Sequence, residues 1–292
     1  MKSKYILEIF AGVLILFGLA SCEDAIDIKL DKGSSQLAVD ALIMVNDGLQ
    51  TIRLTKTTPY FENGGGAPGA SGAEVGIASS KGQLFKFLED PNKPGNYISE
   101  IPITGTTNEI FYLDVRHEGQ TFYAVSLLVR GTVIDSVYQD NRSAEFGNEA
   151  GSFVELIAKD SVGAGDLCWL RYSLNGKADL RYNRLGAAFP ADAAFNPGDA
   201  DGLDFIYPIR NSINGTKGYL IGDTLAIELL SIDPEQWRFL KEMDRQLNNT
   251  GLFANPIANV RGNIFNQDST SKINAVGCFG MARVSRDGVR IK

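Results

Sequence analysis

The chain has 292 residues, of which 44% are hydrophobic and 10% aromatic, and its formal net charge at pH 7 is −7. Its length suffices for two ordinary domains or one large β domain, and its hydrophobic content argues against a disordered chain. The acidic balance, together with the absence of any run of Lys and Arg in the sequence, argues against nucleic acid as a partner.

Residues 1–21 have the pattern of a secretory signal peptide. A basic start at Lys2 and Lys4 precedes the unbroken apolar run Ile9–Ala20. This run is too short for a helix that must cross the ~30 Å hydrocarbon core of a bilayer. The ending Leu19-Ala20-Ser21-Cys22 resembles the lipobox of bacterial lipoproteins. The resemblance implies cleavage before Cys22 and a diacylglycerol and an acyl chain such as palmitate on that residue. An ordinary signal peptide with a chance cysteine is the alternative.

Residues 22–36 are polar, and we expect them to form a tether between the lipid and the folded body. Glu23 and Asp24, directly after Cys22, resemble the acidic signal that sends lipoproteins of Bacteroidota to the cell surface. This resemblance implies a protein that is lipid-anchored in the outer membrane and faces the cell exterior. A tether that is merely polar is the alternative.

Residues 37–130 are predicted to form an immunoglobulin-like antiparallel β-sandwich, so the fold is expected to be mainly β. Apolar residues alternate over short segments, as a strand with one buried face requires. Asn46-Asp47-Gly48 and His117-Glu118-Gly119 are typical of tight turns between such strands. The expected strands are Leu37–Val45, Thr51–Lys56, Ala73–Ala78, Gln83–Leu88, Ile110–Arg116 and Thr121–Val129.

Residues 131–292 are predicted to form a second β-rich domain with one capped α-helix near 234–248. Asp233 suits the N-cap of this helix, Pro234 its first position, and Gln236 the capping box. Its apolar residues recur at helical spacing on one face, which we expect to pack on the adjacent sheet: Trp237, Leu240, Met243 and Leu247. The expected strands begin with Val133–Val137 and continue with Phe153–Lys159, Cys168–Leu174, Thr224–Leu230, Val260–Phe265 and Ala275–Val284, the last two closing the second sheet.

Nine short segments, in this order, resemble a Bacteroidota outer-membrane lipoprotein family of unknown function, domain-of-unknown-function family 4249. They are Leu37–Ile43, Ile52–Thr57, Ala73–Ile77, Tyr112–Val115, Tyr123–Ser126, Ile134–Val137, Gly222–Thr224, Gly262–Ile264 and Gly277–Gly280. Relatives are often encoded near TonB-dependent transporters. The resemblance therefore implies a binding or accessory component of a TonB-dependent nutrient uptake system, and it supplies no catalytic residues.

The residues themselves do not indicate an enzyme, and we expect no cofactor beyond the lipid. His117 is the only histidine, which excludes zinc sites with several histidines, and we expect it to be solvated in its turn. Cys168 and Cys278 lie in apolar segments and are expected to be buried thiols, with a disulfide as the alternative. Two other function classes stay open. One is a structural or adhesive surface protein that binds glycan, matrix or other cells, and the other is a hydrolase with carboxylates from distant positions.

Two loops are candidates for binding. Tyr60 and Phe61 lie in the long loop 57–72 and could offer aromatic surface to a ligand or a partner. The irregular segment 181–204 also carries aromatic residues. In both loops the alternative is that these residues only anchor the loop to its own sheet.

One candidate calcium site lies in the second loop. Asp199, Asp201 and Asp204 could converge on a hard cation, although the EF-hand pattern itself does not fit because prolines take its first and last positions. An acidic surface turn is the alternative reading.

Overall fold

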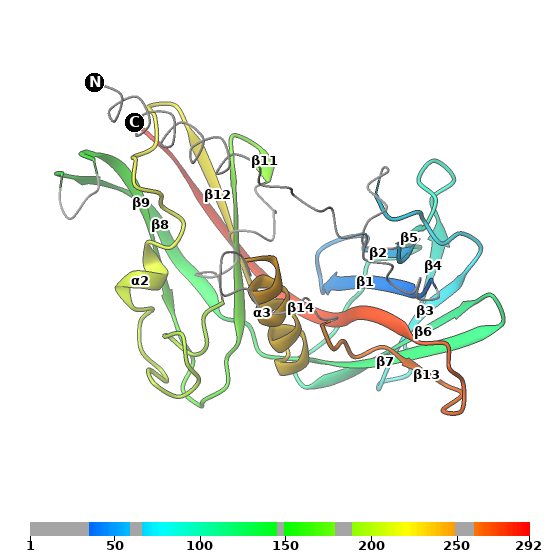
Figure 1. The fold of residues 1–292 in the computed structure, drawn as a ribbon. Coiled ribbons are helices and arrows are strands. Elements are labelled where there is room, and N and C mark those ends of the chain that lie inside the picture. The colour runs from blue at the N-terminus through cyan, green and yellow to red at the C-terminus, as the bar shows by residue number, and fades with distance from the viewer. Residues whose placement is uncertain (1–34, 59–65, 145–148, 179–188, 249–259) are drawn as a thin grey trace, which may run out of the picture. The chain divides into compact units, whose positions relative to one another are not determined.

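The computed structural model describes residues 35–58, 66–144, 149–178, 189–248 and 260–292, and Ser35–Lys292 form one compact unit. The prediction of a mainly β protein is confirmed (Figure 1). The strands are β1 (Leu37–Met44), β2 (Thr51–Lys56), β3 (Glu74–Ser79), β4 (Leu84–Glu89), β5 (Asn96–Ser99), β6 (Glu109–His117), β7 (Gln120–Leu128), β8 (Val133–Arg142), β9 (Gly151–Lys159), β10 (Cys168–Leu174), β11 (Lys177–Ala178), β12 (Thr224–Ile232), β13 (Phe265–Asn266) and β14 (Ala275–Arg290). Two helices are described, α2 (Tyr207–Arg210) and α3 (Pro234–Leu247).

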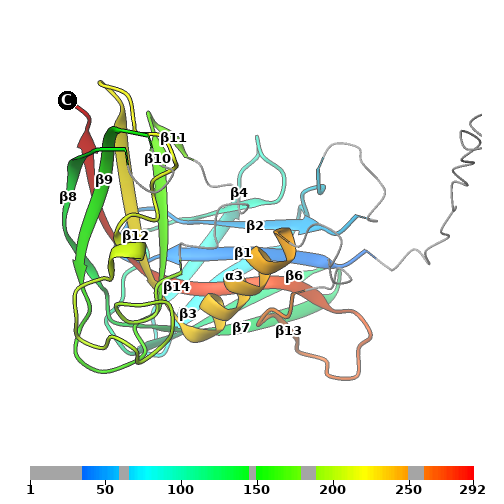
Figure 2. The ribbon, with the colours of Figure 1, turned by 60° about the vertical axis from the view of Figure 1, so that its left-hand side comes forward.

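Hydrogen bonds join twelve of these strands into one sheet, in the order β11-β10-β12-β14-β1-β2-β5-β4-β3-β6-β7-β13, and β8 pairs separately with β9. The long strand β14 links the two halves of this sheet (Figure 2). Its first half, from Ala275 to Ala282, runs parallel to β1, and its second half pairs antiparallel with β12. We expected this strand to close only the second sheet, but β1 has a free edge that the first half of β14 fills. The predicted domain boundary near residue 130 stays a prediction.

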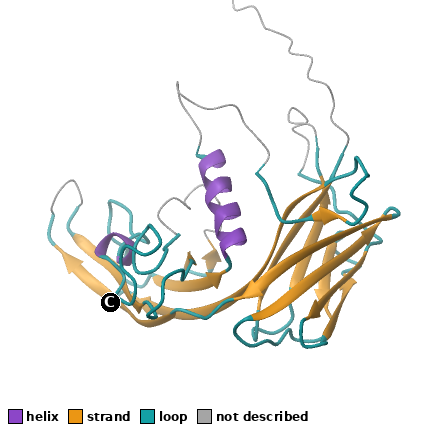
Figure 3. Cartoon of the chain, turned by 90° about the horizontal axis from the view of Figure 1, so that it is seen from below, coloured by secondary structure: helices purple, strands orange, loops and turns teal. Residues whose placement is uncertain are grey.

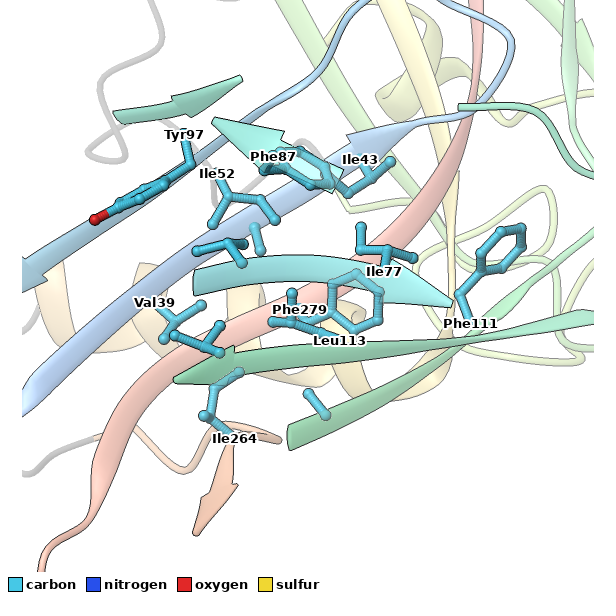
Figure 4. Packing of buried hydrophobic residues seen from close by; sticks show 14 of the residues in the cluster. Val39, Ile43, Ile52, Ile77, Phe87, Tyr97, Phe111, Leu113, Ile264 and Phe279 are labelled. Atoms are coloured by element: carbon cyan, nitrogen blue, oxygen red, sulfur yellow. The ribbon is translucent and has the colours of Figure 1, made fainter. Parts of the chain in front are cut away.

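The inward faces of β1 to β7 and of the first half of β14 enclose one hydrophobic core (Figure 4). Alternation along each strand sends every second side chain inward, as β1 shows with Val39, Ala41 and Ile43. Tyr97, Phe111 and Phe279 are fully buried in this core. Each such side chain contributes about 1.5–3 kcal/mol of hydrophobic stabilisation.

Side chains bridge β7 and β14, which pack together without a ladder of main-chain hydrogen bonds. The Nδ2 atom of Asn263 donates to the carbonyl of Phe279 at 2.8 Å and to that of Val125 at 3.3 Å. The Phe279 N–H donates back to the Asn263 side chain at 2.9 Å. Ser126 Oγ accepts the N–H of Met281 at 2.8 Å. These bonds satisfy backbone groups that would otherwise be buried without partners.

A second hydrophobic core lies between the β8–β9 pair and the sheet formed by β10 and β12. It includes Val154 and Leu156 from β9, Leu170 from β10 and Ile227 from β12. Segments 193–213, which include α2, also contribute buried side chains to it. This stretch looks irregular in the sequence, but in the structure its side chains pack over the second core and do not form an open loop.

Helix α3 stands against the outer face of the sheet (Figure 3). Its N-cap, Asp233, accepts the N–H of Gln236 at 2.9 Å and also accepts a hydrogen bond from the Ser126 hydroxyl. The helix approaches β14 closely because residue 280 is glycine: a Cβ there would lie 2.1 Å from Cδ of Gln236. Of the predicted apolar face Leu240 is buried, whereas Leu247 is exposed. Among the described residues no helix combines the length and the apolar character needed to cross a bilayer.

Candidate functional site

A groove of about 660 Å³ lies between α3, β10 and the outer face of β1 and β2. Its volume falls within the range of sites that take drug-sized ligands. The groove exists because α3 packs on β14 and leaves the outward residues of the neighbouring strand β1 open. These are the alternate residues Ala38, Asp40, Leu42 and Met44.

The walls of the groove are largely apolar. Leu42 and Met44 pack beside Trp169 of β10 and Phe239 of α3. The Trp169 ring stacks on Phe189, with ring centroids 6.3 Å apart and planes 12° from parallel. Phe189 is 4% exposed, so this aromatic residue anchors its loop to the sheet. This agrees with the alternative given above for segment 181–204, in which the aromatic residues hold the loop and do not bind a ligand.

Asp40 and Arg53 place opposite charges on the groove floor. They are directly paired across β1 and β2, and both side chains reach solvent. Although the Asp40 side chain reaches solvent, protein surrounds it on most sides, and this burial raises the pKa of its carboxyl. The positive charge of Arg53 offsets part of this rise in pKa. No described residue donates a hydrogen bond to the Asp40 carboxylate. Asp40 is therefore an acceptor that faces the groove and is available to a ligand.

Two further polar atoms of the groove lining are buried without a hydrogen-bond partner among the described residues. They are Oε1 of Gln236, an acceptor from α3, and Nε of Arg171, a donor from β10. Neither atom has solvent-accessible surface, and the Gln236 amide lies directly over Gly280 of β14, so neither of them is open to the groove. The groove thus combines apolar walls with the Asp40 carboxylate, which accepts no hydrogen bond from the described residues.

An ion-pair network at one end of the groove holds Arg171 in place. The guanidinium of Arg171 lies 5.1 Å from the centre of the Trp169 ring and pairs with Glu228 on β12. Arg286 of β14 donates a hydrogen bond to Glu228 at 2.8 Å and one to each carboxylate oxygen of Asp47, at 2.6 and 2.7 Å. These carboxylates raise the pKa of Arg286. The network ties the β1–β2 turn to β10, β12 and β14.

A separate pair of buried carboxyl groups lies in the connection between β9 and β10. Asp160 and Asp166 are 3% and 7% exposed, and one oxygen of each has no hydrogen-bond donor. Arg130 donates to Asp166 at 2.6 Å, and the Gly202 N–H donates to Asp160 at 3.1 Å. Burial, and then the nearby Asp166 carboxylate, which only a protonated Asp160 can donate to, raise the pKa of Asp160 to about 6. Asp160 is thus poised to take up a proton from mildly acidic solution.

The structure does not bring the three candidate calcium ligands together. Asp199 accepts from the side chain of Asn196 at 3.2 Å, and Asp201 accepts the N–H of Gly163 at 2.8 Å. All three side chains, that of Asp204 included, are exposed. Within the described ranges, no three acidic, histidine or cysteine side chains gather so as to hold a metal ion.

Other predicted residues have mixed outcomes. Cys168 and Cys278 are free and buried, as expected, and burial raises the pKa of Cys168 to about 12.

The prediction of a solvated His117 is wrong. The histidine is 8% exposed because it continues the inward-facing register of β6 after Phe111, Leu113 and Val115.

Cys22, the predicted lipidation residue, lies outside the described residues. So do Glu23 and Asp24, the predicted export signal, and the loop residues Tyr60 and Phe61. The groove itself was missed by sequence reasoning. One signal was present: Asp40 is a carboxylate in the middle of a strand that is otherwise apolar. The two walls of the groove, however, are formed by β10 and α3, which lie far from Asp40 in the sequence.

Comparisons with known proteins add a family but no function. No curated protein and no solved structure matches this chain. A family model described as a domain of unknown function, DUF4249, matches residues 23–287, which is most of the chain. The chain therefore belongs to the DUF4249 family.

Proposed function

We propose that this protein is a non-enzymatic binding component of an outer-membrane nutrient uptake system, displayed on the cell surface by lipid on Cys22. The observation that carries this proposal is the groove beside α3. It offers apolar walls and a carboxylate, that of Asp40, which accepts no hydrogen bond from the described residues, and this is the composition of a small-molecule binding site. The family match itself is silent on function.

The lipobox and the acidic residues Glu23 and Asp24 support the location. A lipid anchor would hold the folded body beside a transporter in the same membrane and raise their effective concentration, so a weak contact would suffice for capture and delivery. The polar tether of residues 22–36 would give the body reach.

An exposed apolar surface supports docking on a protein in that membrane. We name it the β6–β7 face; it consists of Ile110, Tyr112, Tyr123, Val125, Leu127 and Phe265. Its members are neighbours, because Tyr112 pairs with Val125 and Ile110 with Leu127 across β6 and β7. The rings of Tyr123 and Phe265 lie 5.8 Å apart. Clusters of exposed apolar side chains of this kind mark interaction sites.

Affinity purification of the tagged chain from detergent-solubilised outer membranes tests the proposal. We expect a TonB-dependent transporter to copurify with the wild-type chain and to be lost with Val125→Glu. The matched control is Ile221→Glu, which adds the same charge at an exposed apolar residue on the turn before β12. Recovery of no transporter with the wild-type chain would contradict the accessory role, and equal recovery with both variants would contradict docking through the β6–β7 face.

A separate labelling experiment tests the anchor. Radioactive palmitate should label the wild-type chain and not Cys22→Ser, and protease added to intact cells should degrade the wild-type protein. Absence of label from the wild-type chain would refute the lipid anchor, and full protection from protease would refute surface exposure.

A further inference from the structure

We propose that the groove beside α3 binds short peptides with apolar side chains, with the peptide's ammonium terminus at Asp40. The inference rests on the proposed binding role and adds the chemical class of the ligand. It follows from which polar atoms line the groove, where they lie, and what surrounds them.

Asp40 supplies the site for the ammonium group. Its carboxylate faces the groove, receives no hydrogen bond from the described residues and is surrounded by protein on most sides. A carboxylate in such surroundings is best stabilised by a charged donor, because a charge-assisted hydrogen bond is about twice as strong as a neutral one. Arg53, its cross-strand neighbour, limits the net charge of the floor. A zwitterion therefore fits this floor better than a ligand with several positive charges.

Polar side chains on the β2 side of the groove can pair with a peptide backbone. Thr51, Thr55 and Asn96 line the groove and reach solvent, and each has a hydroxyl or amide that can both donate and accept. A peptide offers N–H groups and carbonyl oxygens in alternation, so one bound segment can use donors and acceptors of both kinds.

The remaining lining favours apolar side chains on the peptide. Leu42 and Met44 from the floor and Phe239 and Met243 from α3 all face the groove. Methionine side chains are flexible and polarizable, and they suit binding surfaces that accept varied apolar shapes. A carbohydrate would place hydroxyl groups against these walls, where few partners exist for them. The volume of about 660 Å³ holds more than one amino acid.

Isothermal titration calorimetry of the full chain in detergent, with trileucine as the probe, tests this inference. We expect trileucine to bind the wild-type chain, and binding to fall about tenfold or more with Asp40→Asn, because a hydrogen bond between two charges is lost. N-acetyl-trileucine should lose a similar factor, since it has no ammonium group. Ala38→Trp should abolish binding by filling the groove without removing a charge.

The controls separate specific binding from loss of folding and from general stickiness. Asp114→Asn, at a half-exposed carboxylate of β6 outside the groove lining, should leave the affinity unchanged. Thermal unfolding of each variant checks that it is folded. If Asp40→Asn does not fold, N-acetyl-trileucine still tests the pairing of Asp40 with the ammonium group, because it is measured on the wild-type chain. Maltotriose should not bind.

Three results would overturn the peptide proposal: no binding of trileucine, equal binding of trileucine and its acetylated form, or binding of maltotriose that depends on Asp40. None of them would affect copurification of a transporter, so failure of the ligand class and failure of the proposed function are distinguishable.

Discussion

The buried carboxyl pair makes a sharp prediction about stability and pH. In Asp160→Asn, the new amide can donate to Asp166, and its oxygen can still accept the Gly202 N–H. The variant therefore imitates the protonated state of Asp160 at every pH. We expect it to be more stable than the wild type at pH 8 and equally stable near pH 4.

The sign follows from the raised pKa. Folding lifts the pKa of Asp160 from its ordinary value of 3.8 to about 6, so the folded state binds a proton more tightly than the unfolded state. The resulting stability is fully present below pH 3.8 and is lost as the pH rises through about 6. A shift of this size corresponds to at most about 3 kcal/mol. We expect about 1–2 kcal/mol, because solvent screens part of the interaction of Asp160 with Asp166 and Arg130.

Urea unfolding of both proteins at pH 4.5, 6 and 8 measures the effect. The other carboxyl groups contribute equally to the free energy of unfolding of both proteins, so their contributions cancel in the difference between variant and wild type. This matters because some of them make the protein more stable as the pH rises. Asp135→Asn, at an exposed residue of β8, is the control and should show no such trend. An Asp160→Asn protein that is less stable than the wild type at pH 8, or a difference independent of pH, would refute the reasoning.

Three further predictions follow from the contacts around α3 and β14. Asp233→Ala removes the N-cap of α3 and its link to β7, and should lower the free energy of unfolding by about 1–2 kcal/mol in urea titrations; an unchanged midpoint would contradict this. Gly277→Ala should cost more than about 2 kcal/mol, because Gly277 has φ +108° and a Cβ there would lie 1.9 Å from the carbonyl oxygen of Val39; wild-type thermal stability would show that β1 and β14 are not paired as described. Trileucine affinity should fall as the pH drops, and at a higher pH than for an unperturbed carboxyl group, because burial raises the pKa of Asp40 and the protonated group cannot pair with an ammonium; affinity independent of pH would count against Asp40 as the anchor.

Local features of this fold could be read from the sequence. The strands around the first core follow an alternation of apolar and polar residues, and the cap of α3 is formed by neighbouring residues, Asp233 and Gln236. The hairpin turn predicted at His117-Glu118-Gly119 joins β6 to β7, with positive φ at Glu118 and Gly119. Each of these signals depends on residues that are close together in the chain.

Features that join distant segments could not be read in this way. The pairing of β1 with β14 brings Leu37 beside Ala275, and no periodicity within either strand specifies the other as its partner. His117 shows a smaller error of the same kind, because its place in a turn sequence concealed its inward position on β6. The groove requires β1, β10 and α3 to meet, so Asp40 alone could not reveal it.

The central claim, that the groove beside α3 is the ligand site, can be tested directly by NMR with ¹³C-methyl methionine. The chain has four methionines. Met44 and Met243 line the groove, whereas Met281 is fully buried in the first core and serves as an internal control. We predict that trileucine shifts the Met44 and Met243 signals in proportion to occupancy and leaves Met281 unchanged. Saturating trileucine that moves neither groove signal, or that moves Met281 alone, would contradict the account.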